Sequence, residues 1–165
     1  MNSQTLITSG DAHLEELLVF RLGEETYGVN ILHVQEIRSY EAPTRMAHAP
    51  DYIKGVVNLR GAIVPIVDLR LKLGYTQAEF TEFTVVIVLN LGHTVVGAVV
   101  DAVADVTALP ADAIKLAPQF EGDLNVTYVR GIATLDDHML IVVDIEVLLS
   151  SAELGLVQAT ATVTI

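Results

Sequence analysis

Residues 53–69, IKGVVNLRGAIVPIVDL, form the stretch that most constrains how this chain can fold. They read as two apolar strands on either side of the corner Arg60-Gly61. Glycine adopts a positive φ without steric cost, so this corner predicts a tight turn. Pro65 lies inside the second strand and has no N–H to donate, which predicts an edge strand or a bulge at that point.

The same stretch occurs a second time. Residues 129–145 align with 53–69 without a gap, and Gly131 falls on Gly55. The corner differs, because Arg60-Gly61 is replaced by two aspartates. A repeated stretch of this length predicts that one structural unit is built twice.

A second match lies upstream of each copy. Residues 19–37 align with 88–106, so the order of the two matches is the same in both halves of the chain. The second copy carries extra residues at 110–127. Two copies predict two similar subdomains, since a long repeat array needs three or more units.

The composition narrows the class of protein. The chain has 165 residues, is 52% hydrophobic and contains no cysteine, so we expect a well-filled core without disulfides or thiolate metal sites. Its net charge of −12 would repel nucleic acid and anionic lipid. The apolar runs are interrupted within about ten residues, short of the ~20 that a membrane span needs. The N-terminus lacks a signal-peptide pattern, so a cytoplasmic location is expected.

The expected organisation is a single domain over residues 16–150, with a flexible N-terminus (1–15) and a C-terminal tail (151–165). Within the domain we predict two subdomains, separated at the polar connector 75–82. The predicted segments are 16–30 plus 40–75 for the first subdomain, a helical segment at 30–38, and about 83–145 for the second. Residues 68–74 predict a helical turn with Asp68 as N-cap and Gly74 as its stop, and a terminal helix is predicted at 145–154.

No pattern typical of an enzyme site occurs. The histidines are scattered and no two have the i, i+4 spacing of a helical metal site. Nothing in the sequence places Asp101 and Asp105 across a cleft, as a pair of catalytic carboxylates would require. Asp136-Asp137 reads as a hairpin turn. We therefore predict no catalytic residues, no metal and no cofactor.

Two charged residues are not explained by a core. Glu36 lies on the predicted helical segment, and Arg60 lies on the corner that the second copy has lost. An exposed ion pair stabilises a protein by only about 0–1 kcal/mol, so a pairing would suit recognition better than stability. The alternative is that they are two unrelated solvated charges.

Several runs resemble the CheW family of chemotaxis coupling proteins, in the version found in enteric-type bacteria. The resemblance extends over 17–149, and the NLRG corner followed by IVPIVDLR is its most specific part. The other runs that carry it are LVFRLGEETYGVNILHVQEIR, TVVIVLNLG, VVGAVVDAVADV and MLIVVDIEVLL.

This resemblance implies an all-β fold of two intertwined five-stranded SH3-like barrels with short helices. It also implies a scaffold without catalytic activity that bridges transmembrane chemoreceptors and the CheA histidine kinase in arrays at the inner face of the membrane. The receptor's helical tip would lie in an apolar groove between the lobes, and the kinase's regulatory domain would pack against a barrel. The positions implied in receptor or kinase coupling are Val34, Glu36, Gly55, Asn58, Arg60 and Gly97.

Two other classes of function remain as alternatives. A small-ligand-binding β-barrel would need a sizeable internal cavity, whereas a Val- and Ile-rich interior predicts a filled one. An enzyme would need a convergent set of titratable groups, and the sequence offers none at a telling spacing.

Overall fold

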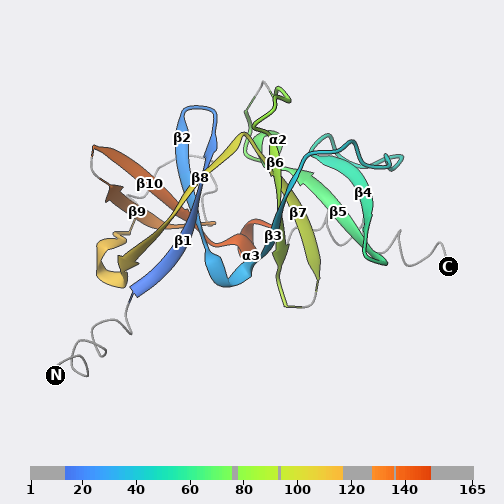
Figure 1. The fold of residues 1–165 in the computed structure, drawn as a ribbon. Helices are drawn as coiled ribbons and strands as arrows, with labels where there is room; N and C mark the ends of the chain where they lie inside the picture. Colours follow the sequence, from blue (N-terminus) through green and yellow to red (C-terminus); the bar gives the residue numbers. More distant parts are fainter. Residues whose placement is uncertain (1–13, 76–77, 93, 117–127, 136, 150–165) are drawn as a thin grey trace.

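The computed structural model folds into two five-stranded β-sheets set side by side, which we call lobe A and lobe B (Figure 1). Short helices connect and flank them. The structure describes residues 14–75, 78–92, 94–116, 128–135 and 137–149. The predicted fold class, two five-stranded SH3-like units with few helices, is confirmed.

The strand order is β8-β1-β2-β10-β9 in lobe A and β3-β6-β7-β5-β4 in lobe B. The strands of lobe A are β1 (Leu14–Leu22), β2 (Glu25–Asn30), β8 (Ala102–Pro110), β9 (Val129–Leu135) and β10 (His138–Val143). Those of lobe B are β3 (Val34–Ser39), β4 (Ile53–Leu59), β5 (Ala62–Asp68), β6 (Val85–Asn90) and β7 (Val95–Val100). The helices are η1 (Ile31–His33), α2 (Leu69–Lys72), η2 (Ala111–Ala113) and α3 (Ile145–Leu148).

The two sequence copies exchange strands between the lobes. Lobe A combines the first two strands of copy one with the last three of copy two, and lobe B combines the remainder. The chain crosses between lobes twice, at η1 and at Asp101. This order corrects the predicted subdomains: lobe A is 14–30 plus 102–143, and lobe B is 34–100. The connector at 75–82 is no lobe boundary, because β5 and β6 on either side belong to one sheet.

The repeat is present in the strand register as well as in the sequence. In lobe B, β5 runs parallel to β7 with Ile66 opposite Gly97. In lobe A, β10 runs parallel to β2 with Val142 opposite Gly28. These are aligned positions of the two copies, so each lobe is built on the same parallel junction.

The aligned glycines 55 and 131 mark the same irregularity in both lobes. The register shifts between Ile53 and Gly55 in β4, and the corresponding shift in lobe A leaves Arg130 unpaired. A Cβ on Gly55 would lie 2.1 Å from the carbonyl oxygen of Thr44, and its φ is +141°. The backbone of residue 44 bridges to β4 there, so the missing side chain is what lets the two backbones approach this closely.

The predicted corner is a two-residue turn between β4 and β5. Arg60 has φ 51° and Gly61 has φ 92°, and positive φ at both positions is the type I′ geometry that suits a twisted hairpin. Pro65 was predicted to lie on an edge strand or at a bulge, and this is wrong. The strand β5 lies between β7 and β4, but its pairing with β7 begins at Ile66, so the missing N–H is not needed.

The predicted helical segment at 30–38 is mostly strand. Asn30 does act as an N-cap, accepting a hydrogen bond from the backbone N–H of Leu32, but the 3₁₀ turn ends at His33. Val34–Ser39 then pairs antiparallel with β6. The helical spacing of apolar residues arose from a bulge after Val34, which shifts the strand's alternation by one residue.

The predicted turn of helix after Asp68 is confirmed as α2, with Asp68 as its N-cap and Gly74 at φ 92° after its end. The aligned Asp144 caps α3 in lobe A. Capping explains why an aspartate closes both copies of the repeated stretch, since its carboxylate satisfies backbone N–H groups that have no partner within the helix.

Three hydrophobic clusters fill the protein. One fills each lobe, and the largest lies between the two sheets and takes buried residues from both. Adjacent residues of β6 show why: Val86 and Val88 face the interior of lobe B, whereas Ile87 and Leu89 face the shared core. Because both faces of such strands are buried, they read as continuous apolar runs.

The ends of the chain are partly outside the described residues. Leu14 and Glu15, expected in a flexible N-terminus, belong to β1, while 1–13 and 150–165 are not described. The terminal helix predicted at 145–154 is described only as α3. Among the helices of the described residues, none has the length and apolarity to cross a bilayer.

Candidate interaction site

Glu36 and Arg60 meet where the two edges of the lobe B sheet come together. Glu36 lies on β3 and Arg60 on the β4–β5 turn, and the Arg60 Nη2 donates to Glu36 Oε2 at 2.9 Å. Arg38 lies further away, with its Nη1 3.7 Å from the same oxygen. Two guanidinium groups therefore share one carboxylate, which leaves these three side chains with one net positive charge. Of the two readings of Glu36 and Arg60, the paired one is correct.

The turn that carries Arg60 is held by Asn58. Its side-chain oxygen accepts a hydrogen bond of 2.9 Å from the backbone N–H of Gly61. Arg60 itself is 64% exposed, so most of the guanidinium remains available to solvent or to a partner. Glu36, Asn58 and Arg60 thus form one cluster, which we call the turn cluster.

The other three predicted residues do not join the turn cluster. Val34 is the first residue of β3, and it packs partly buried against the shared core at the η1 crossover. A Cβ on Gly97 would lie 2.7 Å from Ile66 Cδ1 and 2.8 Å from Val86 Cγ1, inside lobe B. Gly55 faces the backbone of residue 44. Both glycines are therefore explained by the packing of the fold.

The interior of lobe B has little room for a ligand. A cavity of about 80 Å³ opens beside Asn58, between β3, β4 and β6, and Val57, Leu59 and Ile66 are among its apolar walls. Pockets for small ligands usually measure roughly 300–1,000 Å³. This geometry gives no support to the alternative of a small-ligand-binding barrel.

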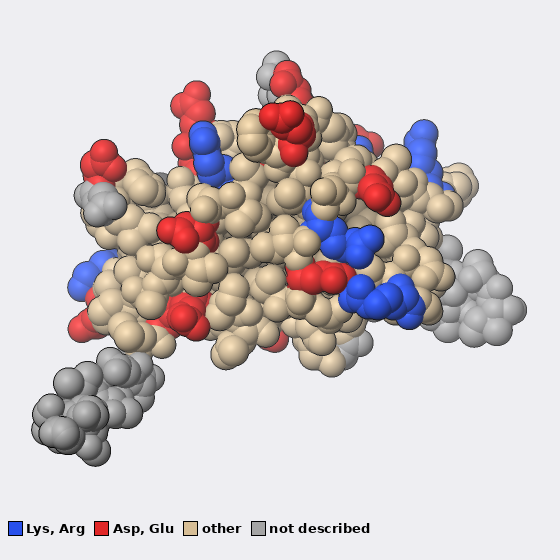
Figure 2. Space-filling view, viewed as in Figure 1, with Lys and Arg blue, Asp and Glu red and all other residues tan. Residues whose placement is uncertain are grey.

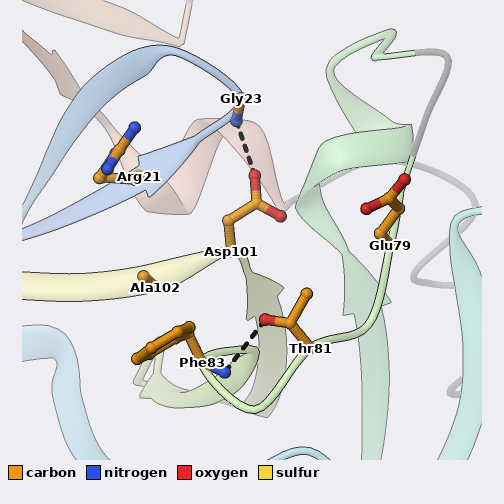
Figure 3. Close-up of a pocket in the computed structure, with 7 residues that line it drawn as sticks. All are labelled: Arg21, Gly23, Glu79, Thr81, Phe83, Asp101 and Ala102. Atoms are coloured by element: carbon orange, nitrogen blue, oxygen red, sulfur yellow. Dashed lines mark hydrogen bonds between the residues drawn. The ribbon is translucent and has the colours of Figure 1, made fainter.

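A larger hollow of about 580 Å³ opens at the junction of the lobes. Figure 3 shows it between the β1–β2 turn, the Asp101 crossover and the loop that leads into β6. The groove here was expected to be apolar, but the wall is mixed. Its lining residues are Arg21, Gly23, Glu79, Thr81, Phe83, Asp101 and Ala102. The apolar area between the lobes is instead taken up by their shared core.

A buried arginine beside this hollow was not found by sequence reasoning. The Arg70 side chain is 1% exposed and Asp68 is fully buried. The Arg70 Nε and Nη2 each donate at 2.9 Å to a different oxygen of Asp68, which is the two-point geometry that arginine forms with carboxylates. Arg70 Nη1 donates to Asp101 Oδ1, also at 2.9 Å.

Further contacts hold the same guanidinium. It donates to the carbonyl oxygen of Glu79 and lies 4.8 Å above the centre of the Phe80 ring. Burial lowers the pKa of Arg70, but the hydrogen bonds and charges of the two aspartates outweigh this and raise it. The sequence did hold one signal for Arg70: the two copies differ there, since the aligned residue in the second copy is Glu146.

Charge is divided unevenly between the lobes. Most Lys and Arg residues lie in 34–75, and most Asp and Glu residues lie outside it. In Figure 2 blue side chains gather over the lobe B half, while red predominates over the lobe A half. Complementary surfaces of this kind steer and orient protein partners.

Asp101 and Asp105, considered as a pair in the sequence, do not form a common site. Asp101 bonds Arg70 and the Gly23 N–H, whereas Asp105 accepts from the N–H of its own neighbour. Asp136 is not described. Across the described ranges, no group of His, Cys, Asp or Glu is arranged to hold a metal ion. The fold defines a class: a two-lobed β-protein of paired five-stranded sheets, with an exposed charged cluster on lobe B.

Comparison with known proteins names the family. The family model described as CheW-like domain matches residues 16–153. The chemotaxis protein CheW of Klebsiella aerogenes is 53% identical over 153 residues, covering 93% of this chain and 92% of that protein. The probable chemotaxis protein CheW of Rhizobium etli is 41% identical and covers 84% of this chain and 89% of that protein. The chain belongs to the CheW-like family, whose members are scaffolds without catalytic activity.

A solved structure agrees with this assignment. The scaffolding protein TtCheW from Thermoanaerobacter tengcongensis superposes with a TM-score of 0.76 at 29% identity, covering 84% of this chain and 90% of that chain. The similarity therefore extends over both lobes.

Proposed function

We propose that this protein is a chemotaxis adaptor that couples chemoreceptors to the CheA histidine kinase. The observation that carries the proposal is the CheW-like match across both lobes, together with relatives named as chemotaxis proteins and a neighbour named as a scaffolding protein. The protein would act in the cytoplasm, recruited to receptor arrays at the membrane.

The turn cluster would serve as a recognition point. Because Arg60 and Arg38 share the single carboxylate of Glu36, the cluster can accept an acidic side chain from a partner. The exposed guanidinium would orient the partner, and Val34, two residues before Glu36 on β3, would add apolar contact. The resemblance implies these positions in receptor or kinase coupling without dividing them between the two partners.

The coupling would work by geometry. A scaffold shifts a partner's equilibrium only if it binds the partner's states with different affinity. The receptor's helical tip would contact the scaffold differently in its on and off states, and the rigid lobes would transmit that difference to the kinase.

The test is a reconstitution of receptor fragment, CheA and this protein, with kinase phosphorylation measured. We expect the wild type to raise phosphorylation and to bring it under receptor control. Arg60→Ala should weaken pull-down of receptor or kinase. The matched control is Arg130→Ala, which removes an ion pair with Glu15 inside lobe A. Absence of any effect of the wild type on phosphorylation would refute the proposal.

A charge swap separates recognition from stability. In Glu36→Arg combined with Arg60→Glu the ion pair can re-form, but the charges presented to a partner are reversed. If the cluster recognises a partner, the swap stays defective. Full recovery of coupling by the swap would show that only the ion pair itself matters.

A further inference from the structure

We propose that Arg70 and Asp101 are positioning residues that fix the orientation of lobe A relative to lobe B. We further propose that coupling requires this orientation, a step that rests on the proposed function. The proposal starts from one connected polar network at the crossover, which we call the latch: Asp68, Arg70, Asp101 and the backbone of Gly23.

The latch links the two lobes through named bonds. In lobe B, the two oxygens of Asp68 accept hydrogen bonds from Nε and Nη2 on one edge of the Arg70 guanidinium. Arg70 then donates to Asp101 Oδ1, and the other oxygen of Asp101 accepts from the backbone N–H of Gly23 at 2.7 Å. Gly23 lies in the β1–β2 turn of lobe A, and Figure 3 shows its bond to Asp101. One carboxylate therefore connects a buried cation of lobe B to the backbone of lobe A.

Tyr75 adds a second connection to the same turn. It follows α2 in lobe B, and its hydroxyl contacts Glu25 and, at 3.0 Å, the hydroxyl of Tyr27. Its ring lies so close to Gly23 that a Cβ there would be 2.7 Å from Tyr75 Cε2. Tyr75 therefore contacts this turn of lobe A directly, and Arg70 reaches it through Asp101.

The shared core alone does not fix the orientation of the two lobes. The core joins the lobes through apolar side chains from both sheets, and hydrophobic attraction has no preferred direction. A buried ion pair adds little net stability, and its best-attested use is to fix one arrangement among similar ones. The latch adds directional hydrogen bonds between the lobes, whereas the core adds only non-directional apolar contact.

The other crossover shows what an unlatched connection looks like. By the sequence alignment, Leu32 of η1 occupies the position of Asp101, and its side chain is 86% exposed. His33 makes a hydrogen bond of 3.3 Å to the carbonyl oxygen of Asn90. Glu146 occupies the position of Arg70. The duplication therefore built a latch at one crossover and left the other without these side chains.

The first test measures orientation and needs no partner. The chain has no cysteine, so Ala62→Cys in lobe B and Thr134→Cys in lobe A can carry spin labels for distance measurement. In this background, Asp101→Leu installs the residue found at the other crossover. We expect a broader or displaced interlobe distance distribution, and Arg130→Met, which breaks an ion pair within lobe A, should leave it unchanged.

A second variant tests the same proposal if Asp101→Leu folds poorly. Asp68→Asn with Arg70→Met removes the buried charges together and should displace the distribution in the same sense. Circular dichroism and thermal unfolding confirm that each variant is folded. A folded latch variant whose distribution coincides with that of the unsubstituted background overturns the proposal.

The second test measures coupling. Asp101→Leu should reduce receptor control of CheA phosphorylation about five-fold or more, the lower end of the usual range for coupling between sites, while separate binding to receptor and kinase persists. If the wild type itself fails to couple, the proposed function is wrong and the distance result still stands. If the wild type and Asp101→Leu couple equally, the orientation role in coupling is wrong.

Discussion

The two lobes share a frame and differ in their charged residues. Each has the same strand order, the same parallel junction, a β-bulge with a glycine behind it and an aspartate that caps a one-turn helix. Arg60 and Arg70, by contrast, exist only in the lobe B copy of the repeated stretch. The shared features are those that fold the chain, and the unshared ones lie at the turn cluster and the latch. Divergence between duplicated lobes thus points to function where similarity points to structure.

The largest expected difference between the lobes comes from the buried arginine. Arg70→Met leaves Asp68 buried without its partner and should cost about 3–5 kcal/mol of the free energy of unfolding. Glu146→Met, at the aligned exposed position in lobe A, should change it by about 0.5 kcal/mol or less. Urea denaturation measures both, and similar losses in the two variants would contradict the contrast.

The glycines behind the bulges should instead behave alike in both lobes. In Gly55→Ala and in Gly131→Ala the new methyl group meets a backbone carbonyl oxygen at 2.1 Å and 2.4 Å, so we expect losses of about 2–4 kcal/mol in each. Gly92→Ala is the control, because its φ is 97° but nothing lies within 4 Å of the Cβ, leaving only backbone strain of about 1–2 kcal/mol. A mild effect in one lobe alone would show that the frame is not equivalent.

A smaller effect, present at neutral pH and lost in acid, should appear at the ion pair between Glu15 and Arg130 in lobe A. The hydrogen bond from Arg130 holds the pKa of Glu15 below its usual value, although burial opposes it. A lowered folded-state pKa favours folding above the unfolded-state pKa, and this contribution is lost as pH falls through the folded value. Arg130→Met should therefore cost about 1 kcal/mol or less at neutral pH and nothing in strong acid. Denaturation curves across pH test this, and a pH-independent loss would rule it out.

The smallest effect on stability should come from the turn cluster. Arg60 is largely exposed, so Arg60→Ala should change the free energy of unfolding by about 0–1 kcal/mol. A thermal melt beside the pull-down described above would show whether lost binding occurs without lost stability. A large drop in melting temperature would show that the cluster serves stability and not recognition.

Local chemistry made much of the fold predictable. The gapless repeat predicted two similar units, the Arg60-Gly61 corner predicted the turn, and Asp68 with Gly74 predicted a one-turn helix. Each depends on backbone preferences within a few residues. The errors came from longer range: the bulge after Val34 imitated a helical period, and the central position of β5 depends on strands far away in the chain.

The candidate site was predictable in part for the same reason. The sequence selected Glu36 and Arg60 as charges that no core explains, but only the closing of the lobe B sheet brings them within 2.9 Å. Arg70 was missed, because a charged residue in a one-turn helix looks solvated until the other lobe buries it.

The sequence by itself determined that one unit is built twice, that a Val- and Ile-rich core fills it, and that each copy carries a glycine and a closing aspartate at the same positions. Only the tertiary structure decided which strands share a lobe. A strand pairs as well with its partner's counterpart in the other copy as with its own partner, so local preferences do not choose between them. The choice depends on the core that both sheets bury and on the crossover at which Arg70 meets Asp101.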